Sequence, residues 1–213
     1  MILVGQYDSP YVRRVAITLH HYGIPFTRNP ISVFSDADAM AKINPVVRIP
    51  SLVLDDGEVL IDSGAILDHL DEVVGPARTL VPRSGVERRR VLQLMATATG
   101  ATDKMGALVY ERHFHKPEAV NEEWAARCKG QFLGGLAYLE RQLEGDWLFG
   151  GRFTQADLTT ATTLGYVRLR VPEVSLERTF PRLARLSDRC EVLSAFQAAR
   201  PSADEVMPAG GKI

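Results

Sequence analysis

Residues 8–15 read Asp8-Ser9-Pro10-Tyr11-Val12-Arg13-Arg14-Val15 and follow the apolar opening Met1-Ile2-Leu3-Val4. The pattern predicts a strand that stops at a polar turn and re-emerges as a helix. Ser9 is a favoured N-cap because its hydroxyl can accept a hydrogen bond from a free amide of the first turn, and Pro10 suits the first helical position. A helix N-terminus at the end of a strand also favours an anionic ligand. Taken alone, the stretch favours a plain helix cap.

Composition sets broad limits on the protein class. A length of 213 residues allows one large domain or two modest ones, and 46% apolar with 24% charged residues is typical of a globular protein. The net charge of −1 indicates neither a nucleic-acid nor a membrane-surface partner. The opening is too short for a signal-peptide core, and no run is as long as a membrane span. Cys128 and Cys190 form no CxxC pair. We therefore expect a cytoplasmic protein.

Residues 1–75 alternate between strand and helix signals. Residues 25–33 carry a second strand pattern, and residues 35–43 a short helix that Asn44-Pro45 ends. Two β-rich runs then flank Asp56-Gly57, the preferred pair of a two-residue hairpin turn. Asp62-Ser63 caps a further helix. The predicted order is βαβ, a short helix and then ββα, which makes a small α/β domain with a mixed sheet.

Strand signals fade after the linker predicted at residues 76–85, and residues 86–213 are expected to form an all-helical domain. Two long helices are predicted over residues 86–115 and 118–143. Thr154-Gln155-Ala156-Asp157 is a capping-box pattern, and the helix it starts should end before Pro172. Residues 181–199 supply one or two more helices. The last dozen residues are predicted to be a loosely held tail.

In this order, the motifs resemble the glutathione transferase superfamily, and most of all its bacterial members with a serine facing the thiol. The resemblance rests on four segments spread over nearly the whole chain, which are Ser9–Val15, Asn44–Pro50, Asp62–Ile66 and Phe153–Asp157. It implies a thioredoxin-like N-terminal domain, a helical C-terminal domain, glutathione as cosubstrate and, usually, a homodimer.

The resemblance also implies roles in glutathione binding. The Ile49-Pro50 bond would be cis and would point the backbone N–H and C=O of Ile49 toward the cysteinyl part of glutathione. Ser63, with the amides of its helix, would hold the γ-glutamyl carboxylate, and Asp62 would pair with the amine. A helix cap explains the same pair and is compatible with this role. Two basic residues could reach the glycyl carboxylate or be solvated surface charges, and these are Lys42 and Arg48.

The resemblance also implies that the Ser9 side chain faces the glutathione sulfur. Its hydroxyl can donate a hydrogen bond to the thiolate, and a bond to a charged group contributes about 1.5–3 kcal/mol. That energy would lower a thiol pKa from about 8.5 to near 7. Tyr7 is the rival donor, since other family members use a tyrosine near the end of this strand. It lies one residue beyond the expected position, which turns a strand side chain to the other face, so Ser9 is preferred.

Several other residues are compatible with either a functional or a purely structural role. Arg13 either tunes the local field or pairs with a carboxylate elsewhere, and we favour the pairing. His113 and His115 lack a third ligand, so no metal site is predicted. Three aromatic residues are candidate walls of a second-substrate pocket but are by default core residues, and these are Tyr110, Phe114 and Tyr166.

The predicted function is a glutathione transferase of the detoxification type, in which the activated thiolate attacks a small hydrophobic electrophile. Glutathione-dependent peroxide reduction, isomerisation and dehalogenation use the same thiolate and remain alternatives. A non-catalytic glutathione-binding regulatory protein of the same fold is a third possibility. The acceptor substrate does not follow from the sequence.

Overall fold

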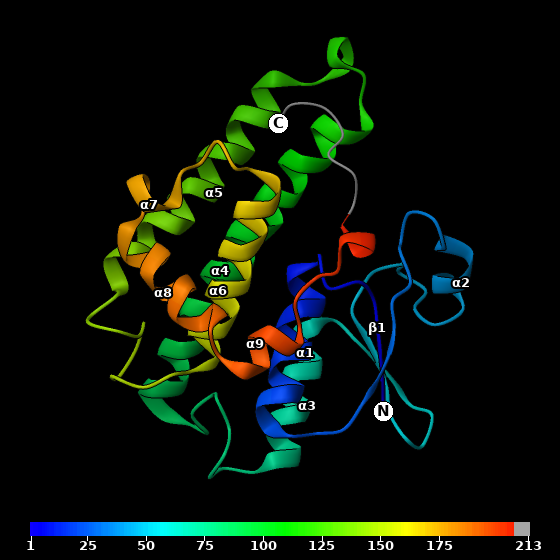
Figure 1. Ribbon diagram of the computed structural model, residues 1–213, viewed down its shortest axis with the longest axis vertical. Helices are drawn as coiled ribbons and strands as arrows, with labels where there is room; N and C mark the ends of the chain where they lie inside the picture. The colour runs from blue at the N-terminus through cyan, green and yellow to red at the C-terminus, as the bar shows by residue number, and fades with distance from the viewer. Residues whose placement is uncertain (207–213) are drawn as a thin grey trace. The chain divides into compact units, whose positions relative to one another are not determined.

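The computed structural model describes residues 1–206 and divides into two compact units. The first unit contains Met1–Arg83 and, from Val192 onward, the described end of the chain, while the second contains Ser84–Glu191. Figure 1 shows the elements of both units. By this division the chain returns to the first unit after Glu191. The assignment of residues 86–213 to one helical domain stays a prediction.

The first unit has the predicted order of strands and helices, so the thioredoxin-like fold is confirmed. Between residues 1 and 83 its elements are β1 (Ile2–Val4), α1 (Pro10–Tyr22), β2 (Thr27–Asn29), α2 (Ala37–Ala41), β3 (Ser51–Val53), β4 (Val59–Ile61) and α3 (Ser63–Val74). The late segment adds α9 (Ser194–Ala198) and the 3₁₀ turn η2 (Ala203–Glu205).

The four strands form a mixed sheet in the order β2-β1-β3-β4. β1 pairs in parallel with β2 and antiparallel with β3, which itself pairs antiparallel with β4. Leu3 lies opposite Leu52 in this register, and both side chains are buried. α1 and α3 pack against each other, because each presents an apolar stripe at helical spacing, as the sequence predicts.

The β3–β4 hairpin is confirmed, but its turn differs from the predicted two-residue form. Gly57 N–H donates to the carbonyl oxygen of Leu54 at 3.1 Å, and Leu54 N–H donates to that of Glu58 at 2.8 Å. Three residues therefore lie between the last paired positions. Gly57 has φ 91°, in the left-handed region that closes such three-residue loops.

The second unit is helical. It contains α4 (Gly85–Phe114), the 3₁₀ turn η1 (Pro117–Ala119), α5 (Glu122–Gln142), α6 (Gln155–Arg170), α7 (Leu176–Thr179) and α8 (Pro181–Glu191). α4 packs against both α5 and α6 (Figure 1). The break between the two predicted long helices and the end of α6 before Pro172 are confirmed, while no sequence pattern predicts the short helix α7.

The predicted loose tail is wrong for the residues that can be described. Residues 202–206 include η2, and Glu205 there is only 7% exposed. Residues 207–213, also part of that prediction, lie outside the described residues. Within residues 1–206, every helix is too short or too polar to cross a membrane.

Candidate functional site

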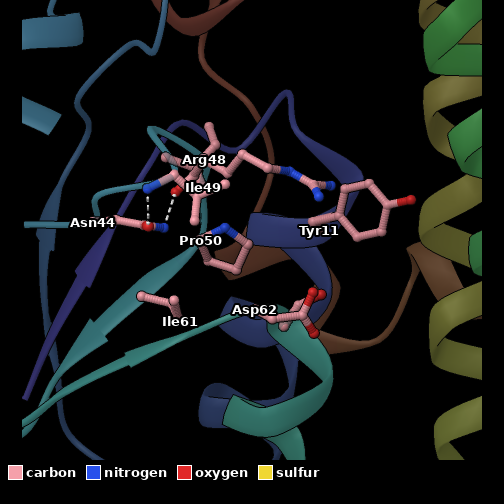
Figure 2. A pocket seen from close by; sticks show the side chains of 9 residues that line it. Tyr11, Asn44, Arg48, Ile49, Pro50, Ile61 and Asp62 are labelled. Carbon is pink, nitrogen blue, oxygen red and sulfur yellow. Dashed lines mark hydrogen bonds between the residues drawn. The ribbon is translucent and has the colours of Figure 1, made fainter. Parts of the chain in front are cut away.

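One pocket of the first unit gathers most of the predicted glutathione-binding residues (Figure 2). Four of its lining residues were predicted to contact the cysteinyl or γ-glutamyl part, and these are Ile49, Pro50, Asp62 and Ser63. Its remaining lining residues are Tyr11, Asn44, Val46, Arg48 and Ile61. Ser9 and Lys42 do not belong to this lining. The pocket thus unites segments from α1, the loop before β3, and the start of α3.

Asn44 organises the loop that presents Ile49. Its side-chain amide donates to the carbonyl oxygen of Arg48 at 2.8 Å, and its Oδ1 accepts from Val46 N–H at 2.9 Å. Asn44 itself is 2% exposed, so its amide needs these partners inside the protein. Val47 takes φ 52°, a conformation that β-branched residues rarely adopt. The Ile49–Pro50 bond that follows is cis, as the resemblance implies.

Gly5 allows this loop to approach the start of α1. At φ 126°, it lies in a region that favours glycine. A Cβ atom built there would lie 2.6 Å from Val12 Cγ2 and 2.8 Å from Ile49 Cβ. No side chain fits in that space. The backbone after β1 therefore packs directly against the Ile49 loop.

Asp62, and not Ser63, is the N-cap of α3. Asp62 Oδ1 accepts from Gly64 N–H at 2.7 Å, while Ser63 is the first helical residue. Ser63 Oγ accepts from two nitrogens of Arg14, Nε at 3.1 Å and Nη2 at 2.7 Å. Both of these side chains are buried. Because Arg14 supplies both donors, the Ser63 hydroxyl proton remains available to a ligand in the pocket.

Ser9 is the N-cap of α1, with Pro10 as the first helical residue. Its Oγ accepts from Val12 N–H at 3.4 Å, a long bond, and the residue is half-buried. The hydroxyl therefore keeps most of its hydrogen-bonding capacity. The assignment of Ser9 as thiolate stabiliser stays a prediction.

Tyr7, the rival donor, is 1% exposed and does not line the pocket. The guanidinium of Arg28 lies over its ring, 3.5 Å from the centroid. Its hydroxyl has no hydrogen-bond partner among the residues described. Burial raises the pKa of the phenol, so Tyr7 keeps its proton at neutral pH. Its burial and its place outside the pocket lining are what disfavour it as the thiolate donor.

Of the remaining candidates, Arg48 lines the pocket and the others do not. Lys42 is exposed at the C-terminal end of α2, and Arg48 is exposed on the pocket rim. Arg13 Nε donates to the carbonyl oxygen of Ala199 at 3.0 Å. On α4, the Phe114 ring packs edge-to-face on both Tyr110 and His113. In residues 1–206, no three His, Cys, Asp or Glu side chains cluster as a metal site would require.

Sequence reasoning missed the supporting roles of Asn44 and Arg14. The Asn44-Pro45 pair predicts the end of a short helix, although an asparagine also readily bonds to the backbone of a turn that follows it. Arg14 belongs to the opening motif, but its partner Ser63 is 49 residues away. Only the packing of α1 on α3 brings the two together.

Family models described as the N-terminal and C-terminal domains of glutathione S-transferase match residues 3–78 and 122–189. A maleylacetoacetate isomerase from Pseudomonas aeruginosa is 31% identical over 219 residues, which cover 98% of this chain and 100% of that protein.

Two solved structures are similar over nearly the whole chain. One is a glutathione S-transferase from Methylobacterium radiotolerans in complex with glutathione sulfonate, with a TM-score of 0.89 and 30% identity over 95% of both chains. The other is a glutathione transferase family member from Pseudomonas fluorescens with bound glutathione. Its TM-score is 0.85 at 32% identity, and the match covers 95% of this chain and 99% of that one.

Proposed function

We propose a glutathione-dependent activity for this chain, which belongs to the glutathione S-transferase superfamily. The observation that carries the proposal is a single pocket lined by Ile49, cis-Pro50, Asp62 and Ser63. Solved relatives of the same fold hold glutathione or its sulfonate. Glutathione is therefore the cosubstrate that we assign to the pocket.

Each end of the tripeptide has a matching group in the chain. The backbone N–H and C=O of Ile49 pair with the cysteinyl unit. The Ser63 hydroxyl donates to the γ-glutamyl carboxylate, and Arg14 behind it adds positive charge to that end of the pocket. Asp62, exposed at the helix start, pairs with the γ-glutamyl amine. Arg48 at the rim meets the glycyl carboxylate, whereas Lys42, outside the lining, remains a weaker candidate for the same role.

Ser9 then stabilises the thiolate. Its O–H donates to the glutathione sulfur, and the N-terminus of α1 favours the same negative charge. The thiolate forms a C–S bond with an electrophilic carbon, and the electron pair displaced goes to a leaving group or onto the rest of the acceptor. We propose a small hydrophobic electrophile as acceptor and detoxification as the purpose.

Isomerisation is the second candidate, because the Pseudomonas aeruginosa relative is named for such a reaction. The same thiolate would add to a double bond and leave after rotation, with no net transfer. A single panel of activity assays would distinguish conjugation and isomerisation from peroxide reduction, dehalogenation and non-catalytic binding. That panel would measure conjugate, peroxide loss, isomer and halide with glutathione present and absent.

Glutathione binding is the first test. Calorimetry should detect binding at or below millimolar glutathione, and the thermal midpoint should rise with ligand concentration. Ser63→Ala should weaken binding about tenfold, since one hydrogen bond to a charged group is lost. Ser63→Thr keeps the hydroxyl and is the matched control. A folded protein without binding at millimolar glutathione contradicts the assignment.

Ser9→Ala tests the mechanism. The variant should bind glutathione nearly as well as the unmodified protein, but the pKa of the bound thiol should rise by about 1–2 units. Thiolate absorbance in the binary complex measures this shift. Tyr7→Phe is the control, because the hydroxyl it removes has no partner among the described residues. A raised thiol pKa in Tyr7→Phe alone would transfer the role to Tyr7. If neither variant shifts the pKa, the backbone amides of α1 are the stabiliser.

A symmetric homodimer in the cytoplasm completes the proposal. The dimer follows from the family, and symmetric dimers are the commonest soluble oligomers. Light scattering should give about twice the chain mass of 23.5 kDa. A single species at the chain mass across working concentrations would exclude the dimer.

A further inference from the structure

The end of the described chain contacts the turn that carries Ser9. Glu205 Oε1 accepts from the backbone N–H of Tyr7 at 3.1 Å and forms an ion pair with Arg28. Its other oxygen, Oε2, accepts from the N–H of Ser202 at 3.2 Å and from its hydroxyl at 3.1 Å. Both carboxylate oxygens are thus engaged, and one of them reaches 198 residues back along the chain.

Arg28 links the carboxylate to the ring of Tyr7. Its guanidinium pairs with Glu205 and stacks over the Tyr7 ring. Burial of Glu205 raises its pKa, but hydrogen bonds from Tyr7 and Ser202 and the charge of Arg28 outweigh this and hold the pKa below its usual range. The carboxylate is therefore charged at neutral pH, and the contact is a charge-assisted one.

The turn that Glu205 contacts leads directly into α1. Ser9 N–H donates to the carbonyl oxygen of Gln6 at 3.2 Å, so residues 6–9 form a closed turn with Tyr7 inside it. A second contact lies one helical turn further on, where Arg13 Nε bonds to the carbonyl oxygen of Ala199 at 3.0 Å. Residues 199–205, which we term the C-terminal segment, therefore hold the chain on both sides of Ser9.

We propose that Glu205 is a positioning residue for the thiolate, holding the residue 6–9 turn so that the Ser9 hydroxyl faces the glutathione sulfur. The inference rests on the proposed function of Ser9. Glu205 lines no part of the pocket, and the groups that bind glutathione lie on the Ile49 loop and at the start of α3. Its loss should therefore change the state of the thiol and leave the affinity for glutathione nearly unchanged.

Glu205→Ala is the main test. We expect the dissociation constant of glutathione to change less than about threefold. The pKa of the bound thiol should rise by about one unit, because the Ser9 hydroxyl would no longer point straight at the sulfur and its hydrogen bond would weaken. The turnover number at neutral pH should fall about tenfold, since misplacement of a reacting group is costly. Hydrogen exchange at the Tyr7 amide, measured without glutathione, should accelerate about tenfold or more.

Three further variants separate positioning from stability. Glu205→Gln keeps an acceptor for Tyr7 N–H, so its turnover number and thiol pKa should lie between those of Glu205→Ala and the unmodified protein. If Glu205→Ala does not fold, the glutamine variant provides the test in its place. Asp204→Ala alters an exposed neighbour in the same 3₁₀ turn and should behave like the unmodified protein. In the double variant Ser9→Ala with Glu205→Ala, the thiol pKa should equal that of Ser9→Ala alone, because Glu205 acts through Ser9.

The measurements on these variants distinguish a failure of the positioning role of Glu205 from a failure of the proposed function. An unchanged thiol pKa in Glu205→Ala, beside a raised one in Ser9→Ala, overturns the positioning role and leaves the proposed function standing. Additive shifts in the double variant, or unchanged exchange at the Tyr7 amide, overturn it as well. If the unmodified protein neither binds glutathione nor lowers its thiol pKa, the proposed function and the positioning role are both overturned.

Discussion

Two capping boxes in this chain have the same local hydrogen bonds, but their carboxylates bind partners at very different distances along the sequence. At the start of α6, Asp157 Oδ2 accepts from the N–H and the hydroxyl of Thr154, each at 2.8 Å. At η2, Glu205 Oε2 accepts from the same two groups of Ser202. The second oxygen differs. Asp157 Oδ1 accepts from Leu148 N–H, nine residues away, whereas Glu205 Oε1 reaches the turn before Ser9.

The charges around the two carboxylates differ as well. Asp157 is fully buried, and burial raises its pKa despite its bonds from Leu148 and Thr154. Glu205 has Arg28 beside it and a lowered pKa. The Asp157 box therefore stabilises a local loop, although burial disfavours the charged form of its carboxylate. The other joins two distant parts of the first unit through an ion pair.

A capping motif therefore predicts a helix start but not which group the second oxygen of its carboxylate binds. Thr154–Asp157 belongs to one of the four segments that carry the resemblance, and the bonds of this box are all local. Ser202–Glu205 has the same pattern and lies in a stretch predicted to be loose. Its contact with Tyr7 depends on the fold of the first unit.

Asp157→Ala should give the largest effect. It leaves two buried backbone amides without an acceptor, and each such group costs about 1–3 kcal/mol. We expect the free energy of unfolding, measured in urea, to fall by about 3 kcal/mol. Asp157→Asn keeps one acceptor oxygen and should lose about half as much. A loss below about 1 kcal/mol in the alanine variant would contradict a structural role for this box.

Removal of the two N-cap hydroxyls should give intermediate and unequal losses. Thr154 is buried and Ser202 is exposed. Thr154→Ala should therefore cost about 1–2 kcal/mol of unfolding free energy, and Ser202→Ala about 0.5 kcal/mol. Thr154→Ser and Ser202→Thr retain the hydroxyls and serve as controls. Equal losses at the two positions would remove the distinction between a buried box and an exposed one.

The smallest effect should appear in the dependence of stability on pH. A lowered folded pKa means that Glu205 stabilises the protein above the pKa of an unfolded glutamate, and that this contribution is lost as the pH falls through the folded pKa. The stability difference between the unmodified protein and Glu205→Gln should thus shrink below about pH 4. Asp157, with its raised pKa, should show the opposite trend against Asp157→Asn. Parallel trends in urea titrations would exclude the assigned charge environments.

The sequence alone determined the order of the elements in residues 1–75, the hairpin, the starts of α1, α3 and α6, and the break between α4 and α5. Each depends on residues close together in the chain. The N-cap at Ser9, Gly57 in the hairpin and the Thr154–Asp157 box all involve bonds that span a few residues. Local preference and periodicity are sufficient for such features. The length of the hairpin turn was wrong because one pair of turn residues is compatible with more than one loop length.

Tertiary structure decided which of these residues meet. Arg14 bonds to Ser63, Gly5 admits the Ile49 loop, and Glu205 bonds to Tyr7 N–H. The two residues in each of these contacts are at least 44 positions apart, so no local pattern signals them. A buried cation or carboxylate must find a partner, because an unpaired charge away from water is costly. Which partner it finds depends on the packing of α1, α3 and the C-terminal segment, and the sequence specifies that packing only through the whole fold.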